Sequence, residues 1–103
     1  MGDYRIEFES ICWERVMDGV RQKAVSEHGK RVRLVEYSKP MLPHWCEKGH
    51  YGYILQGRFE IEFEDGIRIF EKGDGVFIPE GKKYRHRARV LSNIVTVVFA
   101  EDV

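Results

Sequence analysis

Strict alternation of polar and apolar residues is the feature of this sequence that most restricts its fold. It is clearest in residues 58–64, which read RFEIEFE. Successive side chains of a β-strand point to opposite faces, so Phe59, Ile61 and Phe63 would share one face and the charged residues the other. The pattern predicts an antiparallel strand with one buried face and one face in water.

Turn signals separate this strand from others of the same kind. Asp65-Gly66 follows it directly and predicts a type I′ hairpin turn, in which both central residues need positive φ. Residues 12–18 carry the one indication of a helical turn. Short segments, most of them next to glycine or proline, predict further strands at residues 20–25, 31–37, 51–56, 67–70, 76–78, 83–90 and 94–100. The chain is therefore expected to be all-β, and a barrel rather than an open sandwich, because closure removes exposed sheet edges.

Length and charge limit what such a protein can do. A chain of 103 residues supports one hydrophobic core, so residues 1–103 are expected to form a single domain. A formal net charge of zero provides no surplus of cations for nucleic acid. The N-terminus has no secretory pattern, and no apolar run approaches the roughly 20 residues of a membrane span. We expect a cytoplasmic protein that binds neither nucleic acid nor membrane and keeps its cysteines as thiols.

Metal-binding side chains gather in one short window, residues 43–50, which read PHWCEKGH. His44 and Cys46 have the same parity, so in an extended segment both would point to one face, about 7 Å apart. His50 follows Gly49, which permits a tight bend, and begins the strand at 51–56. Imidazole and thiolate are ligands of Zn, Fe, Cu and Ni, so the window predicts a site for one of these metals.

The same window resembles a family motif. Residues 44–57 read HxCxxxHxxxxxxG, and residues 73–84 read GDxxxxPxGxxY. These are similar to the two motifs of the cupin superfamily, HxHx(3-4)Ex(6)G and GDx(4)PxGx(2)H, and the likeness is closest to small single-domain cupins. The resemblance implies a double-stranded β-helix, or jelly-roll barrel, with a metal at its mouth held by three His and one Glu or Gln.

The chain departs from the family pattern at three of the four ligand positions. His44 matches the first histidine, Cys46 replaces the second, and His50 replaces the carboxylate or amide. Tyr84 replaces the last histidine, and His86 follows two residues later, where alternation would place it on the same face as Tyr84. We predict a divalent transition metal bound by His44, Cys46, His50 and His86, with Tyr84 beside it as a phenol donor or a weak fifth contact. The softer ligand set favours Zn, Fe, Ni or Cu over Mn.

Plainer interpretations of these residues stay open. His44 and His50 could be hydrogen-bonded residues of a barrel that has lost its metal. Cys46 could be a small buried apolar side chain or a reactive thiol. His86 could belong to a solvated basic edge at residues 82–89, in which Arg85, Arg87 and Arg89 would face outward.

Two classes of function are compatible with this site. The resemblance implies a metal-dependent enzyme acting on a small polar molecule, of the sugar-acid isomerase, lyase or dioxygenase type. The candidate catalytic acid-base residues are Tyr84 and any of the histidines that do not bind the metal. The alternative is a non-catalytic module that binds a small ligand or senses metal or redox state, or a metal-free remnant. The fold by itself does not choose between these chemistries.

One strand predicts a partner. Tyr51, Tyr53 and Leu55 have the parity opposite to His50 and should lie on the outer face of their strand. An apolar outer face on so small a protein needs a cover. We expect a homodimer, which is also what the resemblance to small cupins implies.

Overall fold

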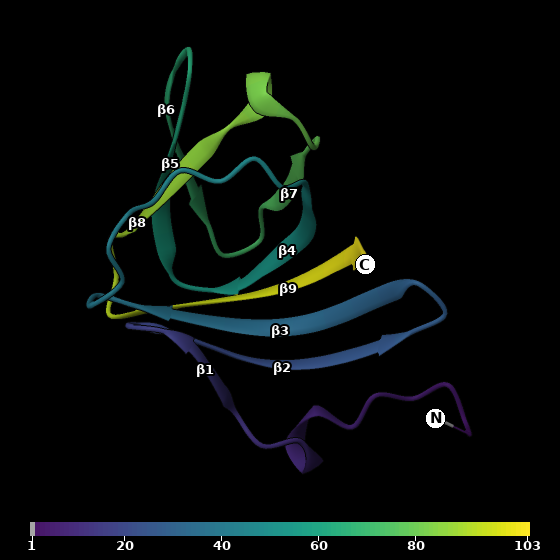
Figure 1. The fold of residues 1–103 in the computed structure, drawn as a ribbon. Helices are drawn as coiled ribbons and strands as arrows, with labels where there is room; N and C mark the ends of the chain where they lie inside the picture. Colours follow the sequence, from purple (N-terminus) through teal and green to yellow (C-terminus); the bar gives the residue numbers. More distant parts are fainter. Residues whose placement is uncertain (1) are drawn as a thin grey trace.

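The computed structural model describes residues 2–103, which form nine β-strands and two short 3-10 turns (Figure 1). The strands are β1 (Glu14–Met17), β2 (Val20–Glu27), β3 (Lys30–Ser38), β4 (His50–Gln56), β5 (Arg58–Phe63), β6 (Gly66–Glu71), β7 (Gly75–Ile78), β8 (His86–Val90) and β9 (Ile94–Asp102). The turns are η1 (Phe8–Ser10) and η2 (Lys82–Tyr84). No helix in residues 2–103 has the length and apolar character required to cross a membrane.

The strands form two antiparallel sheets. The larger has the order β1-β2-β3-β9-β4-β7 and the smaller has the order β6-β5-β8. The all-β jelly-roll architecture is confirmed, but closure into a barrel is not shown. Within residues 2–103 no strand ladder joins one sheet to the other, and an isolated bridge from Cys46 pairs with the edge of β8 at His86.

The core lies between the inner faces of the two sheets. Alternation along β5 buries Phe59 and Ile61, as the sequence pattern predicts. From the larger sheet, Val35, Val97 and Ile54 are completely buried and lie side by side on β3, β9 and β4. The same alternation turns every second residue of these strands away from the core.

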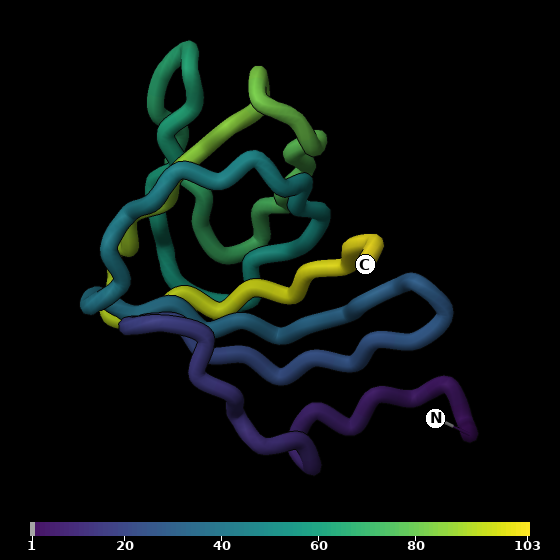
Figure 2. The backbone as a smooth tube through the Cα atoms, viewed as in Figure 1, coloured from purple at the N-terminus to yellow at the C-terminus, as the bar shows by residue number. Residues whose placement is uncertain are grey.

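A long connection crosses the molecule between β3 and β4. Figure 2 shows residues 39–49, in blue to teal, passing from one side of the molecule to the other. Within the described residues 2–103, an isolated bridge between Cys46 and His86 is its only pairing with a strand. This connection therefore contains most of the predicted metal-binding window, residues 43–50, and crosses the space between the sheets.

Two local expectations were wrong. Residues 12–18 contain no helical turn, because Glu14–Met17 pairs with β2 as strand β1. The β5-β6 hairpin exists, but Phe63 pairs with Gly66, so its turn residues are Glu64 and Asp65, neither of which has positive φ. Asp65 accepts two hydrogen bonds from the Arg68 guanidinium beside this turn.

The basic strand β8 has the predicted orientation. The side chains of Arg85, Arg87 and Arg89 face outward, where each forms an ion pair with a glutamate across from it on or beside β5. The pairs are Arg85 with Glu64, Arg87 with Glu62 and Arg89 with Glu60. Exposed ion pairs of this kind contribute little to stability. On the opposite face of β8, the His86 side chain points inward and is buried.

Candidate metal centre

Cys46 is placed by the backbone of His86. The Cys46 amide donates to the His86 carbonyl at 2.8 Å, and the His86 amide donates to the Cys46 carbonyl at 2.9 Å. Residues that exchange both hydrogen bonds in an antiparallel pair project their side chains to the same side. The connection between β3 and β4 thus brings its thiol next to the first residue of β8.

His50 is placed by the inner face of β4. Its ring packs against Phe99 of β9, with ring centroids 5.1 Å apart. Gly52 makes room for this contact, because a Cβ at Gly52 would lie 2.1 Å from the Val98 carbonyl oxygen and 2.7 Å from the Phe99 ring. The absence of a side chain at Gly52 therefore lets Phe99 pack beside His50.

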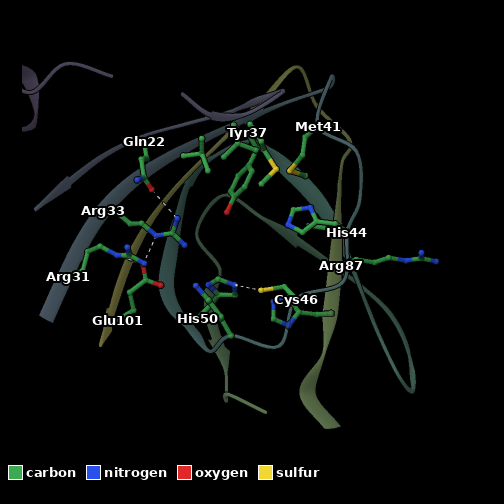
Figure 3. Close-up of a pocket in the computed structure, with 16 residues that line it drawn as sticks. Gln22, Arg31, Arg33, Tyr37, Met41, His44, Cys46, His50, Arg87 and Glu101 are labelled. Atoms are coloured by element: carbon green, nitrogen blue, oxygen red, sulfur yellow. Dashed lines mark hydrogen bonds and ion pairs between the residues drawn. The ribbon is translucent and has the colours of Figure 1, made fainter. Parts of the chain in front are cut away.

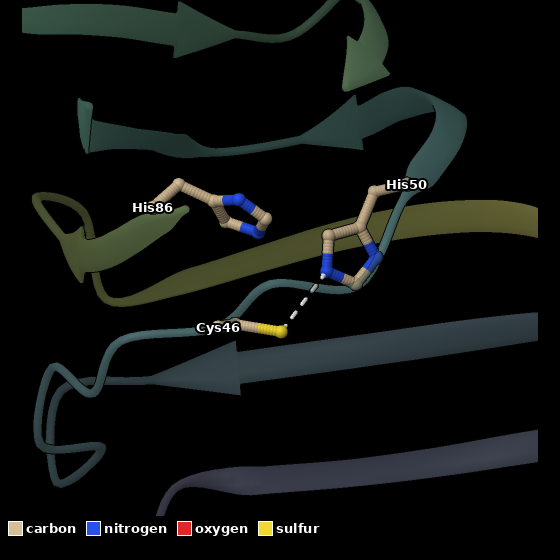
Figure 4. Close-up of side chains that lie close together, drawn as sticks. All are labelled: Cys46, His50 and His86. Atoms are coloured by element: carbon tan, nitrogen blue, oxygen red, sulfur yellow. Dashed lines mark hydrogen bonds between the residues drawn. The ribbon is translucent and has the colours of Figure 1, made fainter. Parts of the chain in front are cut away.

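Three possible ligand atoms converge between the sheets. The atoms offered by Cys46, His50 and His86 all lie within 4.8 Å of one another (Figure 4). Cys46 Sγ is 3.9 Å from His50 Nε2, and the two imidazole centroids are 5.0 Å apart. Sulfur and nitrogen ligands of a tetrahedral zinc are about 3.5 Å apart, so a small adjustment of the side chains suffices to bring both to one ion.

The burial and hydrogen bonds of the His50 and His86 imidazoles favour metal binding. His86 is buried, and its Nδ1 lies 3.0 Å from the Tyr84 carbonyl oxygen, which requires a proton on Nδ1, so that in the neutral ring Nε2 is the nitrogen with the lone pair. His86 Nε2 and His50 Nδ1 are buried without a hydrogen-bond partner. Burial, and then the nearby His86 and Arg33, lower the pKa of His50 to about 4, so its ring is neutral near pH 7. Buried, unpartnered imidazole nitrogen is unfavourable unless something binds it.

No protein-family model matches the sequence, and no curated protein matches it. Solved structures do match its fold. KdgF from a Halomonas species is 27% identical over 97% of this chain and 92% of its own, with a TM-score of 0.75. An RmlC-like cupin from Shewanella frigidimarina is 17% identical over 95% and 90%, with a TM-score of 0.72. The chain is a small cupin-superfamily protein. A third structure, the polyketide cyclase RemF from Streptomyces resistomycificus, is 17% identical over 93% and 76%, with a TM-score of 0.73.

The cluster of this cupin opens into a cavity of about 430 Å³ (Figure 3). The lining residues come from β1, β2, β3, β4, β8, β9 and the connection at residues 39–49. His44 also lines this cavity, but it is exposed and lies outside the cluster of three. The structure thus brings together three of the four predicted ligands and places His44 nearby in the cavity wall.

Tyr84 does not share a face with His86. Residues 82–84 form the 3-10 turn η2, and β8 begins only at His86, so strand alternation does not extend back to Tyr84. The Tyr84 ring lines a separate pocket with Phe63 and Phe77. Only its backbone carbonyl reaches the cluster, through His86 Nδ1.

Two further cavity residues were missed in the sequence. Tyr37 and Arg33 lie on the inner face of β3 with Val35, and both line the cavity. Figure 3 shows the Tyr37 oxygen pointing into the cavity. Burial raises the pKa of Tyr37 to about 12, although Arg33 opposes the shift, so the phenol keeps its proton. Their shared parity within residues 31–37 is the signal that could have identified them.

Proposed function

We propose that this cupin is a metal-dependent enzyme that acts on a small polar molecule in the 430 Å³ cavity, with a divalent transition metal held by Cys46, His50 and His86. The observation that carries the proposal is the convergence of three ligand atoms from three separate segments, with His86 Nε2 buried and without a hydrogen-bond partner. Buried polar atoms without partners are rare in folded proteins.

The donor set fits a soft or borderline ion. One thiolate and two neutral imidazoles suit Zn, Cu, Ni or Fe(II) better than Mn. Three protein ligands are typical of a catalytic site, in which a further position is available to water or substrate. A bound ion of this kind would act as a Lewis acid toward a carbonyl or carboxylate oxygen. We place the protein in the cytoplasm, where a reducing environment keeps Cys46 available as a ligand.

The chain's own residues supply the remaining chemistry. His44 lies in the cavity wall outside the cluster, so its imidazole is available to accept or donate a proton. The Tyr37 phenol, which keeps its proton, can donate a hydrogen bond to a substrate oxygen. His86 is held by its hydrogen bond to the Tyr84 carbonyl and stays in one tautomer. We assign proton transfer to His44 in place of Tyr84.

A ligand-binding or sensing module without turnover is the second candidate. One observation favours it, since Tyr84, the acid-base residue indicated by the sequence, lines a different pocket. A screen for turnover of small keto acids and sugar acids by the metal-loaded protein separates the two candidates. An enzyme should lose turnover in His44→Ala while keeping its metal, whereas a binding module should show no turnover in any form.

Metal content tests the proposed centre directly. Wild-type protein loaded with zinc and then desalted should hold about one ion per chain, measured by elemental analysis. Cys46→Ser and His86→Ala should lose at least about 10-fold in zinc affinity, because each removes one ligand. Cys12→Ser is the matched control, since Cys12 is an exposed thiol away from the cavity and its removal should leave zinc content unchanged.

Equal zinc content in wild type, Cys46→Ser and His86→Ala would overturn the centre. His44→Ala adds a further comparison, because the structure predicts full zinc content for it. Zinc loss in His44→Ala equal to the loss in His86→Ala would mean that all four predicted residues bind the ion.

A further inference from the structure

The cavity is more positive than the chain as a whole. The chain has no formal net charge, yet three cationic side chains and one carboxylate face the cavity. The cations are Arg31, Arg33 and Lys48, and the carboxylate is Glu101. Arg87 also borders the cavity, but its guanidinium pairs with Glu62 on the outer face.

Two arginines share Glu101. Its carboxylate lies 2.7 Å from Arg31 Nη2 and 2.5 Å from Arg33 Nε, and the side chains of Arg33 and Glu101 are only 14% and 9% exposed. Arg31 and Glu101 face each other across β3 and β9, and Arg33 is the next inward residue of β3. One carboxylate balances one guanidinium, so a positive charge remains in a largely enclosed space. Such a charge is costly unless an anion pairs with it.

Arg33 is held with one edge available. Its Nη1 donates to Gln22 Oε1 at 3.2 Å, and its guanidinium lies over the Phe99 ring at 5.3 Å. In residues 2–103, Nη2 makes no hydrogen bond, and Figure 3 shows the guanidinium reaching into the cavity between Gln22 and Glu101. A guanidinium held in this way is preorganised for a carboxylate, which it binds with directional N–H donors.

Tyr37 adds a neutral donor to the same space. Its ring packs against Phe59 at 6.0 Å, and its hydroxyl makes no hydrogen bond within residues 2–103 while pointing into the cavity (Figure 3). Arg33 and Tyr37 therefore present unused donors from β3 to the same cavity that the Cys46, His50 and His86 cluster lines.

We propose that Arg33 and Tyr37 form a carboxylate-binding subsite and that the substrate is a small organic acid, held by its carboxylate at β3 with its other end toward the cluster. This inference rests on the proposed function, because it names the substrate class of the same cavity. A volume of about 430 Å³ is at the small end of ligand pockets and suits a molecule of this size.

Matched acid and neutral probes test the subsite. Pyruvate and glycolate would be titrated into the protein in parallel with hydroxyacetone and ethylene glycol, which resemble them but lack the carboxylate. Binding would be followed by amide chemical shifts in chelator-treated protein and in zinc-loaded protein. The measurement on metal-free protein is required because a carboxylate can also bind zinc directly, without contacting Arg33. We expect each acid to bind at least about 10-fold more tightly than its neutral counterpart in both forms.

Variants locate the effect. Arg33→Gln should remove the preference for acids, and Tyr37→Phe should weaken acid binding about 3- to 10-fold. Arg33→Lys keeps the positive charge beside Glu101 but lacks the planar guanidinium that binds a carboxylate through two N–H groups. We expect it to lower the affinity for the acids about 10-fold. This variant replaces Arg33→Gln in the test if Arg33→Gln does not fold. Arg21→Gln is the matched control, because Arg21 pairs with Glu36 on the outer face of the same sheet. It should bind the acids as wild type does.

The two proposals fail separately. Equal binding of acids and neutral counterparts by metal-free wild type, or unchanged acid binding in folded Arg33→Gln, would overturn the subsite even where zinc binds stoichiometrically. Arg33-dependent acid binding in a protein that binds no zinc would support the subsite and overturn the metal centre.

Discussion

His50 shows at the scale of one residue how position changes chemistry. In water an imidazole is half protonated near pH 6.5, but here burial is the largest cause of a pKa of about 4, followed by the nearby His86 and Arg33. The ring is therefore a neutral donor of a lone pair under conditions in which an exposed histidine begins to titrate. This state is the one that a metal ligand requires.

Acid should destabilise the metal-free protein through His50. The group has a lower pKa folded than unfolded, so its contribution to stability is complete above about pH 6.5 and is lost as the pH falls through about 4. Between pH 7 and pH 5 the free energy of unfolding should drop by on the order of 1 to 2 kcal/mol from this group. Urea unfolding of chelator-treated protein at the two pH values measures the change.

Two histidine variants make this measurement specific. His50→Gln should flatten the pH dependence, because it removes the titrating group. His28→Asn should keep it, since His28 is exposed in the β2-β3 turn and asparagine tolerates its positive φ of 53°. An equal pH dependence in wild type and His50→Gln would show that another group is responsible.

At the scale of elements, the site depends on how closely β4 and β9 approach. Gly52 faces Phe99 across the two strands, and no larger residue fits there without displacing backbone. The Phe99 ring in turn contacts both the His50 ring and the Arg33 guanidinium. The pair of strands β4 and β9 therefore positions both the cluster of Cys46, His50 and His86 and the guanidinium of Arg33.

Gly52→Ala should be strongly destabilising. The new Cβ would lie 2.1 Å from the Val98 carbonyl oxygen, so the strands must separate, at a cost of about 2 to 4 kcal/mol. Chemical denaturation measures the loss. Gly75→Ala on the adjacent strand β7 is the control, because its nearest contact would be an ordinary 3.7 Å and its φ is not positive. Similar stability of the two variants would contradict this account of Gly52.

At the scale of the whole molecule, the larger sheet has an apolar outer face. Tyr51, Tyr53 and Leu55 of β4 are 39%, 48% and 44% exposed, as their parity predicts. Phe77 of β7 is 79% exposed and its ring packs edge-on against Tyr51 at 4.8 Å. Aromatic residues gathered on one sheet face are typical of a surface that is covered in the functional protein.

We expect a second copy of the chain to cover this face. Sedimentation velocity should give twice the mass of one chain, and the double variant Tyr53→Lys with Leu55→Lys should give a monomer, because it places four lysines on a two-fold contact. Ile69→Lys on β6 is the control, since it changes a residue of similar exposure, 46%, in the other sheet and should leave the dimer intact. A monomeric wild type would refute the expectation.

Local periodicity carried most of the information about strands. Alternation in residues 58–64 predicted which side of β5 is buried, and parity in β4 predicted the outward direction of Tyr51 and Tyr53. These features depend on neighbours one or two residues apart in the chain, which the sequence displays directly. The limits of this information appear at Tyr84, where a 3-10 turn interrupts the alternation that the sequence implied.

Convergence in space was decided by long-range pairing. The sequence alone pointed to Cys46, His50 and His86 as ligand types, but the irregular segment at 39–49 has no period from which the direction of Cys46 or His44 follows. The bridge from Cys46 to His86 across forty residues of chain sets one direction, and the β3-β9 register sets Arg33 beside Glu101. The sequence determines which side chains can bind a metal or a carboxylate. The distance between two of these side chains depends on backbone hydrogen bonds between segments far apart in the chain, and only the folded structure contains those bonds.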